Sequence, residues 1–239
     1  MKPTQKLNGP TLDDFIEEGR AMESAIQSVA DINHSDDEPA REAVSECRQL
    51  AIGIIAIALS YISDFTENMP FDPKLTYCLA CTAAFAQGAI VSSSLIAQKY
   101  MKAAAVLKQD IELLARFHEV VQDCAVEGRT PQMSCLPESG RRSYGELNKI
   151  AHPSNFEEMR SVLGYPSGDF SVLPIHNEKT ESALYQVHLW NSVEISRAAT
   201  ELLTLLINAW PTNREAEKGL EACIVSFEYL FQKVRLILQ

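Results

Sequence analysis

Residues 49–63, QLAIGIIAIALSYIS, constrain the fold of this chain more than any other stretch, because they are apolar on nearly every side of a helix. Apolar residues continue at helical spacing in both directions, so we expect one helix from about residue 38 to about residue 68. The positions expected to face inward are Val44, Cys47, Ala51, Ile54, Ile55, Ala58, Ile62 and Phe65. A helix with almost no polar face has to be covered by other helices, so this one should be the central helix of a bundle.

The other segments also repeat apolar residues with a helical period, and no alternation of period two lasts for more than a few residues. The expected helices cover residues 12–32, 73–127, 140–151, 178–209 and 213–237, with a further short helix between 154 and 164. The stretch 73–127 is long enough for two helices in line, and Gly88 is its one weak point. Ser139 is the expected N-cap of helix 140–151, and Ser154 with Glu157 spells a capping box.

These patterns predict an all-α fold, a helical bundle of about six to eight helices. No internal repeat or low-complexity tract divides the chain, so we expect a single domain over residues 1–239. Within it, the acidic helix and loop of residues 1–40 should pack on the bundle.

Charge and cysteine content limit the function classes. The formal net charge is -11, concentrated in the N-terminal third, which repels phosphate backbones and makes nucleic acid an unlikely partner except for RNA at a local site. The N-terminus has no apolar signal region, so we expect a cytoplasmic protein with reduced cysteines. Segments 49–63 and 75–98 are too short or too diluted by polar residues to favour a membrane span, and we interpret both as buried helices.

No cofactor or metal is expected. The chain has no G-x-G-x-x-G, Walker loop, G-x-S-x-G or H-E-x-x-H motif. Cys78 and Cys81 have the spacing of half a zinc site, but no second close pair of ligands completes it. We interpret both cysteines as core residues of an apolar helix.

Lys108 and Glu112 lie four residues apart and therefore share one helix face. An exposed pair of this kind is an ordinary helix-stabilising ion pair. Apolar residues surround this pair, however, so it can also lie at the edge of the core, where paired charges often line sites.

The segment YGELNKIAHPSN, residues 144–155, carries the most distinctive polar residues. Tyr144 lies with Leu147 on its apolar face, and Arg141, Asn148 and His152 share the border with the charged face. Pro153 disfavours helical geometry at the preceding residue, so His152 should end the helix. His152 is then either a helix stop whose ring bonds Asn148 or a local carbonyl, or a site residue held between two loops.

His188 and Asn191 interrupt the apolar stripe of helix 178–209. His188 is either a satisfied core histidine or a ligand-binding residue that meets His152 across the bundle. The sequence leaves both interpretations open.

The pattern Tyr144-x-x-Leu147-Asn148-x-x-x-His152-Pro153, preceded by Lys108-x-x-x-Glu112, resembles uncharacterised all-helical bacterial proteins with an Arg-x-x-x-Glu pair before a Tyr-x-x-Leu-Ser-x-x-x-His-Pro segment. Those proteins look related to the HEPN superfamily, helical domains of toxin-antitoxin, abortive-infection and RNA-cleaving systems. The resemblance covers residues 80–160 by motif. It implies a HEPN-like bundle in which His152 and Asn148 are the candidate catalytic residues.

This chain departs from the HEPN ribonuclease pattern at two positions. Lys108 stands in place of the arginine of the first pair, and a lysine is a weaker bidentate partner for a carboxylate. Leu147 stands where the Arg-Asn-x-x-x-His motif of the nucleases has its arginine, which stabilises phosphate charge. Arg141 is about three turns away from His152 along the helix, too far to replace it within one subunit.

The leading expectation is therefore a HEPN-like binding or regulatory module without enzymatic activity, a homodimer in bacterial stress or phage defence that binds a protein or a small ligand. One alternative is a HEPN-type ribonuclease with His152 as acid or base. Another is a small-molecule sensor with a pocket between helices 75–97 and 178–209. The expected ligand-binding residues are Lys108, Glu112, Arg141, Tyr144 and His188.

Overall fold

Seven α-helices run through the part of the chain that the computed structural model describes, which is residues 9–30, 39–66, 73–96, 100–152, 157, 160, 178–209 and 214–237. They are α1 (Leu12–Ala30), α2 (Pro39–Thr66), α3 (Pro73–Ile96), α4 (Tyr100–Val121), α5 (Glu138–Ala151), α7 (Glu178–Ala209) and α8 (Arg214–Ile237). A short 3₁₀ turn, η1 (Met133–Cys135), precedes α5. The described residues include no strand, so the all-α bundle expected from the sequence is confirmed.

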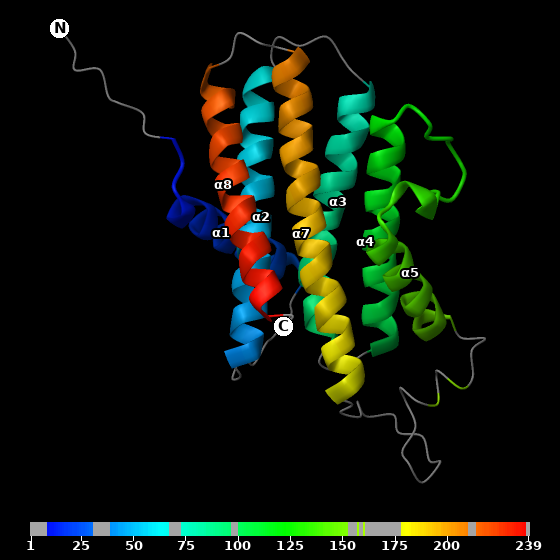
Figure 1. Cartoon of the computed structure of the whole chain (residues 1–239). Helices are drawn as coiled ribbons and strands as arrows, with labels where there is room; N and C mark the ends of the chain where they lie inside the picture. The colour runs from blue at the N-terminus through cyan, green and yellow to red at the C-terminus, as the bar shows by residue number, and fades with distance from the viewer. Residues whose placement is uncertain are drawn as a thin grey trace, which may run out of the picture.

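Helix α2 lies at the centre of one half of the bundle, as its apolar surface requires (Figure 1). It packs against α1, α7 and α8 and touches α3. Residues 51–58 are buried without interruption, and the expected inward positions from Val44 to Ala58 all belong to the hydrophobic core. The side chains of Ile62 and Phe65 lie outside the described part.

Helix α1 crosses α2 obliquely and meets it at two glycines (Figure 1). A Cβ atom at Gly53 would lie 1.8 Å from the Phe15 carbonyl oxygen, and one at Gly19 would lie 1.9 Å from the Gln49 carbonyl oxygen. Only glycine permits backbones to approach this closely. The acidic N-terminal helix is thereby held directly against the central helix.

Helices α3 and α4 lie side by side, not in line (Figure 1). The long apolar stretch breaks between Ile96 and Tyr100, whereas Gly88 is a continuous part of α3. A Cβ atom at Gly88 would lie 2.4 Å from the Asp110 Oδ1 atom of α4, so this glycine makes room for a neighbouring side chain. The sequence interpretation of Gly88 as a weak point in the helix was therefore wrong.

Helix α3 is the one described helix that is long and apolar enough to cross a membrane, and half of its most apolar window is buried inside the bundle. It packs against α4 and α7 and carries the buried hydroxyl groups of Thr82, Ser92 and Ser93. Cys78 and Cys81 lie in the same core, as expected. Among the described residues, no group of three candidate metal ligands forms. A core helix of a soluble bundle passes the same length and composition test.

Helix α4 ends six residues earlier than the sequence suggested, in a Schellman arrangement. The Asp123 N–H bonds the Val120 carbonyl at 3.2 Å, and the Cys124 N–H bonds the Glu119 carbonyl at 2.9 Å. Asp123 adopts the left-handed conformation that this motif requires, with φ 57°. The chain then turns away from α4 and returns through η1 to α5.

Helix α5 begins at Glu138, with Pro137 as its N-cap residue and no side-chain cap. The prediction of Ser139 as N-cap was wrong, because Ser139 already lies inside the first turn. Of the short helix expected between 154 and 164, only residues 157 and 160 are described, and both are helical. Its capping box at Ser154 and its end near Gly164 lie outside the described residues.

Candidate ligand-binding site

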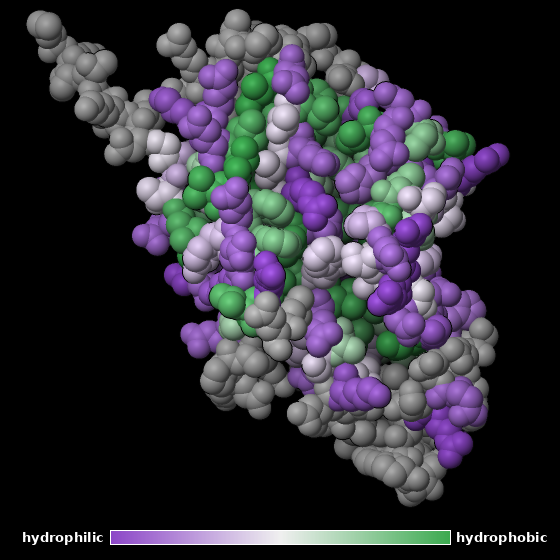
Figure 2. Space-filling view, viewed as in Figure 1, coloured by the Kyte–Doolittle hydropathy of each residue, from purple (hydrophilic) through white to green (hydrophobic). Residues whose placement is uncertain are grey.

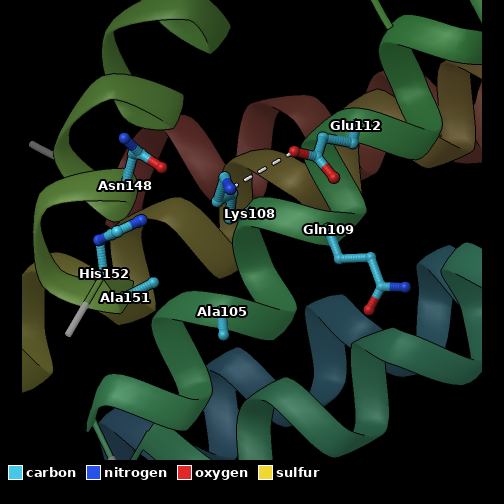
Figure 3. A pocket seen from close by; sticks show the side chains of 7 residues that line it. All are labelled: Ala105, Lys108, Gln109, Glu112, Asn148, Ala151 and His152. Atoms are coloured by element: carbon cyan, nitrogen blue, oxygen red, sulfur yellow. Dashed lines mark ion pairs between the residues drawn. The ribbon is translucent and has the colours of Figure 1, made fainter. Parts of the chain in front are cut away.

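A pocket of about 310 Å³ lies between α4 and α5 (Figure 3). Its lining residues are Ala105, Lys108, Gln109, Glu112, Asn148, Ala151 and His152. The four from α4 and the three from α5 recur at helical spacings of three and four, so each set shares one face of its helix. Two helix faces that pack together thus supply a pocket with mostly polar groups at its wall.

Lys108, Glu112 and Tyr144 form a cluster that ties α4 to α5 beside this pocket. The Lys108 Nζ atom lies 3.6 Å from the Glu112 Oε1 atom, and both side chains are about a quarter exposed. The Tyr144 hydroxyl donates a 2.8 Å hydrogen bond to the same Oε1 atom. The Lys108 ammonium lies 5.3 Å from the centroid of the Tyr144 ring, within the range of a cation–π contact.

This cluster changes the acidity of Tyr144. Partial burial is the main cause, and the Glu112 carboxylate beside the hydroxyl adds to it, so the pKa of Tyr144 rises to about 12. Tyr144 therefore stays a neutral hydrogen-bond donor at every physiological pH. It restrains Glu112 and is not a source of a reactive phenolate.

Asn148 and His152 project from α5 toward Lys108 (Figure 3). His152 is the C-cap of α5, with extended backbone angles, as the following proline predicts. Its backbone N–H bonds the Asn148 carbonyl oxygen at 3.2 Å, while its side chain is exposed at the pocket. His152 thus ends α5 and also lines the pocket.

Leu147 points the opposite way, into the core. It is only 1% exposed and belongs to the main hydrophobic cluster. Tyr144 and Ala151 pack partly against that cluster, as the apolar face of the segment indicated. A nuclease arginine at position 147 would need a different rotation of α5, because this position faces away from the pocket.

Two of the seven residues singled out in the sequence lie apart from this pocket. Arg141 is exposed on the first turns of α5 and does not line the pocket. His188 is buried between α7 and α3, where its Nδ1 atom lies 3.0 Å from the Ser92 Oγ atom. The expectation that His188 could meet His152 was wrong, because His188 is buried beside α3 whereas His152 is exposed at the α4–α5 pocket.

The sequence singled out His188 and Asn191, but it did not reveal two other buried polar residues of the bundle, Arg48 and Asp110. Arg48 of α2 donates to Ser93 and lies near enough to His188 to influence its charge. Burial first and Arg48 second lower the pKa of His188 to about 3. The Asn191 amide donates to the Leu107 carbonyl at 3.4 Å, and burial raises the pKa of Asp110 well above its ordinary value. Only their positions on the inward faces of otherwise apolar helices could have revealed these residues.

Together, the helical bundle and this polar pocket define an all-α protein with a candidate site for a small polar ligand. Comparison with protein-family models, with curated proteins and with solved structures gives no match. The function of the chain is therefore inferred from its own geometry.

Proposed function

We propose that this chain is a HEPN-like helical bundle that acts as a binding or regulatory module, without enzymatic activity, and that its α4–α5 pocket takes a small polar ligand. The observation that supports this proposal is the convergence of Lys108, Glu112, Asn148 and His152 on one pocket. A bacterial stress or phage-defence setting remains part of the proposal through the resemblance of residues 80–160 alone.

The chemistry of the pocket favours a ligand that both donates and accepts hydrogen bonds. Lys108 and the Asn148 amide offer donors, and Glu112 offers an acceptor that already holds Tyr144. The 3.6 Å separation of Lys108 and Glu112 exceeds that of a tight charge-assisted hydrogen bond. A ligand with a carboxylate or carbonyl near an ammonium or amino group can insert between them and satisfy both.

Phosphodiester cleavage is supported less well. The Lys108 charge is offset by Glu112, so the pocket has no uncompensated cation comparable to the arginine of a nuclease. Leu147 is buried, and Arg141 lies outside the pocket. The ribonuclease alternative is favoured by one observation only, that Asn148 and His152 line the same pocket as a lysine.

The test is a binding measurement with three classes of probe: free amino acids, nucleosides and inorganic phosphate. We expect amino acids or nucleosides to shift the NMR resonances of the Asn148 side-chain amide, and phosphate to leave them unchanged. Glu112→Gln should weaken this binding at least tenfold, because it removes the charged acceptor. Arg142→Ala is the matched control, since its ion pair with Glu138 on α5 is exposed and outside the pocket.

Activity on RNA separates the two proposals. If the purified protein cleaves single-stranded RNA and His152→Ala abolishes the cleavage, the ribonuclease alternative is right. A protein that binds probes as above and leaves RNA intact supports the binding module.

The homodimer is proposed on the surface of α8. Val225 is 66% exposed, Leu236 is 72% exposed and Tyr229 is 43% exposed. Spacings of four and seven place these three residues on one helix face, and apolar side chains gather over this side of the molecule in Figure 2. Large exposed apolar stripes of this kind mark interaction surfaces.

A second copy of α8 fits this stripe in an antiparallel arrangement. Glu221 and Arg235 are exposed on the same edge of the stripe, fourteen residues apart. A twofold axis near Glu228 would place Glu221 of one subunit beside Arg235 of the second copy, and Arg235 beside the Glu221 of that copy. Glu228 would then face its own copy. We expect Val225→Glu to shift the protein to monomer in light scattering and Glu228→Gln to strengthen the dimer. An unchanged mass in both variants would contradict this interface.

A further inference from the structure

Two cysteines lie near each other in the loop that joins α4 to α5. Cys124 is exposed and Cys135 is partly exposed, and the Cys124 side chain is near enough to influence the pKa of the Cys135 thiol. The other four cysteines, Cys47, Cys78, Cys81 and Cys223, are all buried. The two accessible thiols of the chain are therefore the two that lie near each other.

Glu119 holds both cysteine segments in place. Its backbone carbonyl accepts the Cys124 N–H at 2.9 Å, and its Oε1 atom accepts the Gln132 N–H at 2.8 Å. The Cys135 N–H in turn bonds the Gln132 carbonyl at 3.1 Å. One residue of α4 thus fixes the start of the loop through its main chain and the end of the loop through its side chain.

Arg116 completes this support. Its guanidinium lies 2.7 Å from the Glu119 Oε2 atom and donates to the carbonyl oxygens of Val126 and Arg129 within the loop. Arg116 is 8% exposed and Glu119 only 2% exposed, so the loop is built around a buried ion pair. The proximity of the two cysteine segments is consequently a product of the fold and not a chance approach of two mobile stretches of backbone.

We propose that Cys124 and Cys135 form a reversible redox site that takes a peroxide or a low-molecular-weight disulfide as its oxidant. With hydrogen peroxide, the Cys124 thiolate attacks one oxygen, the O–O bond breaks, and a sulfenic acid and one water result. The Cys135 sulfur then attacks the Cys124 sulfur, and the S–O bond breaks with release of a second water. Two thiols lose two protons and two electrons, and one peroxide takes up both to give two waters.

The environment assigns the order of these steps. Burial, together with the neighbouring Cys124, raises the pKa of the Cys135 thiol above its ordinary value, so less of Cys135 is present as the reactive thiolate. Cys124 is the more exposed thiol and should meet the oxidant first. Burial raises the pKa of Cys47 to about 11 and that of Cys223 to about 12, which keeps those thiols unreactive.

Formation of a Cys124–Cys135 disulfide would affect helix α5. The loop that a Cys124–Cys135 disulfide would close lies between the end of α4 and the start of α5, and α5 carries Tyr144, Asn148 and His152. Cross-linking this loop restricts the motion of α5 against α4. Oxidation would therefore stiffen the wall of the α4–α5 pocket, whichever ligand that pocket takes.

The experiment treats the reduced full-length protein with a small excess of hydrogen peroxide. We expect the intact mass to fall by about 2 Da, as two protons are lost, and the non-reducing peptide map to contain a peptide linking Cys124 to Cys135. Native thiol titration should fall from two reactive groups to none, and dithiothreitol should restore both. Tm should rise by roughly 5 to 10 °C on oxidation, and amide exchange in α5 should slow.

Two single variants keep the result interpretable. Cys135→Ser should leave a sulfenic acid on Cys124 that dimedone captures, whereas Cys124→Ser should give far less capture at Cys135. Circular dichroism checks that both remain helical. A mass that only rises by oxygen increments, or a disulfide that joins other cysteines or two chains, would overturn the proposal. None of these measurements depends on the ligand of the pocket, so the redox site can fail while the proposed function stands.

Discussion

The Tyr144 hydroxyl donates a 2.8 Å hydrogen bond to the Glu112 Oε1 atom, and this contact joins α5 to α4 across the edge of the pocket. The two residues are 32 positions apart in the chain. The same oxygen faces Lys108, so one carboxylate organises a hydroxyl, an ammonium and the wall of the pocket. The rigidity of the site therefore depends on Tyr144, which does not itself line the pocket.

Removing the hydroxyl should loosen α5. Tyr144→Phe keeps the ring over Lys108 but removes a hydrogen bond to a charged acceptor, so we expect the free energy of unfolding to fall by about 1 to 2 kcal/mol. Urea denaturation measures this change. Tyr77→Phe, at an exposed tyrosine of α3, is the control and should change stability by less than about 0.5 kcal/mol. In a Glu112→Gln background the cost of Tyr144→Phe should shrink, and an equal cost in both backgrounds would refute the coupling.

The α1–α2 crossing should not tolerate a methyl group. Gly53→Ala places a Cβ atom on the Phe15 carbonyl, so α1 has to move, and we expect a loss of about 1 to 3 kcal/mol despite the better helix propensity of alanine. Gly145 is exposed in the middle of α5, with nothing within 4 Å of an added Cβ atom. Gly145→Ala should therefore stabilise the protein by about 0.5 to 1 kcal/mol. Thermal and urea unfolding of both variants check these opposite signs.

Sequence patterns predicted the helices well where apolar periodicity alone decides their extent. Helices α7 and α8 begin and end within a residue of the expected bounds, because their breaks fall at strong turn sequences. Lys108 and Glu112 were predicted to share one helix face, and so were Asn148 and His152. Both pairs line one pocket. Local spacing carries this kind of information directly.

The same patterns did not predict how the helices pack against one another. The break between α3 and α4 contains neither proline nor glycine, so the side-by-side packing of these helices depends on long-range contacts. The Schellman end of α4 uses Asp123 in place of the usual glycine, which hides it from inspection. The sequence leaves two roles open for His188, because a lone histidine on an apolar face does not reveal its partner, here Ser92.

The buried ion pair under the α4–α5 loop should be costly to break. Glu119→Gln removes the charge that offsets Arg116 and weakens the bond to the Gln132 N–H, so we expect a loss of about 3 to 5 kcal/mol. Arg142→Ala, which removes an ion pair with both side chains more than three-quarters exposed, should cost less than about 1 kcal/mol. Urea unfolding compares the two. Similar losses in both variants would show that burial of the first pair has no energetic consequence.

His188 and Asp110 should make opposite contributions to the pH dependence of stability. The folded-state pKa of His188 is lowered to about 3 from 6.5, so the unfolded chain takes up a proton there as pH falls from 6.5, and stability is lost over that window. The folded-state pKa of Asp110 is raised well above 3.8, so the unfolded chain gives up a proton there as pH rises, and stability is lost in the other direction. Between about pH 4 and 6.5 the two effects oppose each other in the wild-type protein.

Single variants should separate the contributions of His188 and Asp110 to the pH dependence of stability. Asp110→Asn leaves His188 alone, so stability should rise with pH over that window more steeply than in the wild type, by up to about 1.4 kcal/mol per pH unit. His188→Gln leaves Asp110 alone, so its slope should change by a similar amount with the opposite sign. The free energy of unfolding in urea, measured at half-unit steps from pH 4 to 7, gives both slopes. Parallel curves for the wild type and both variants would mean that neither side chain changes its proton affinity on folding, and the buried polar groups between α3, α4 and α7 would then have to be solvated.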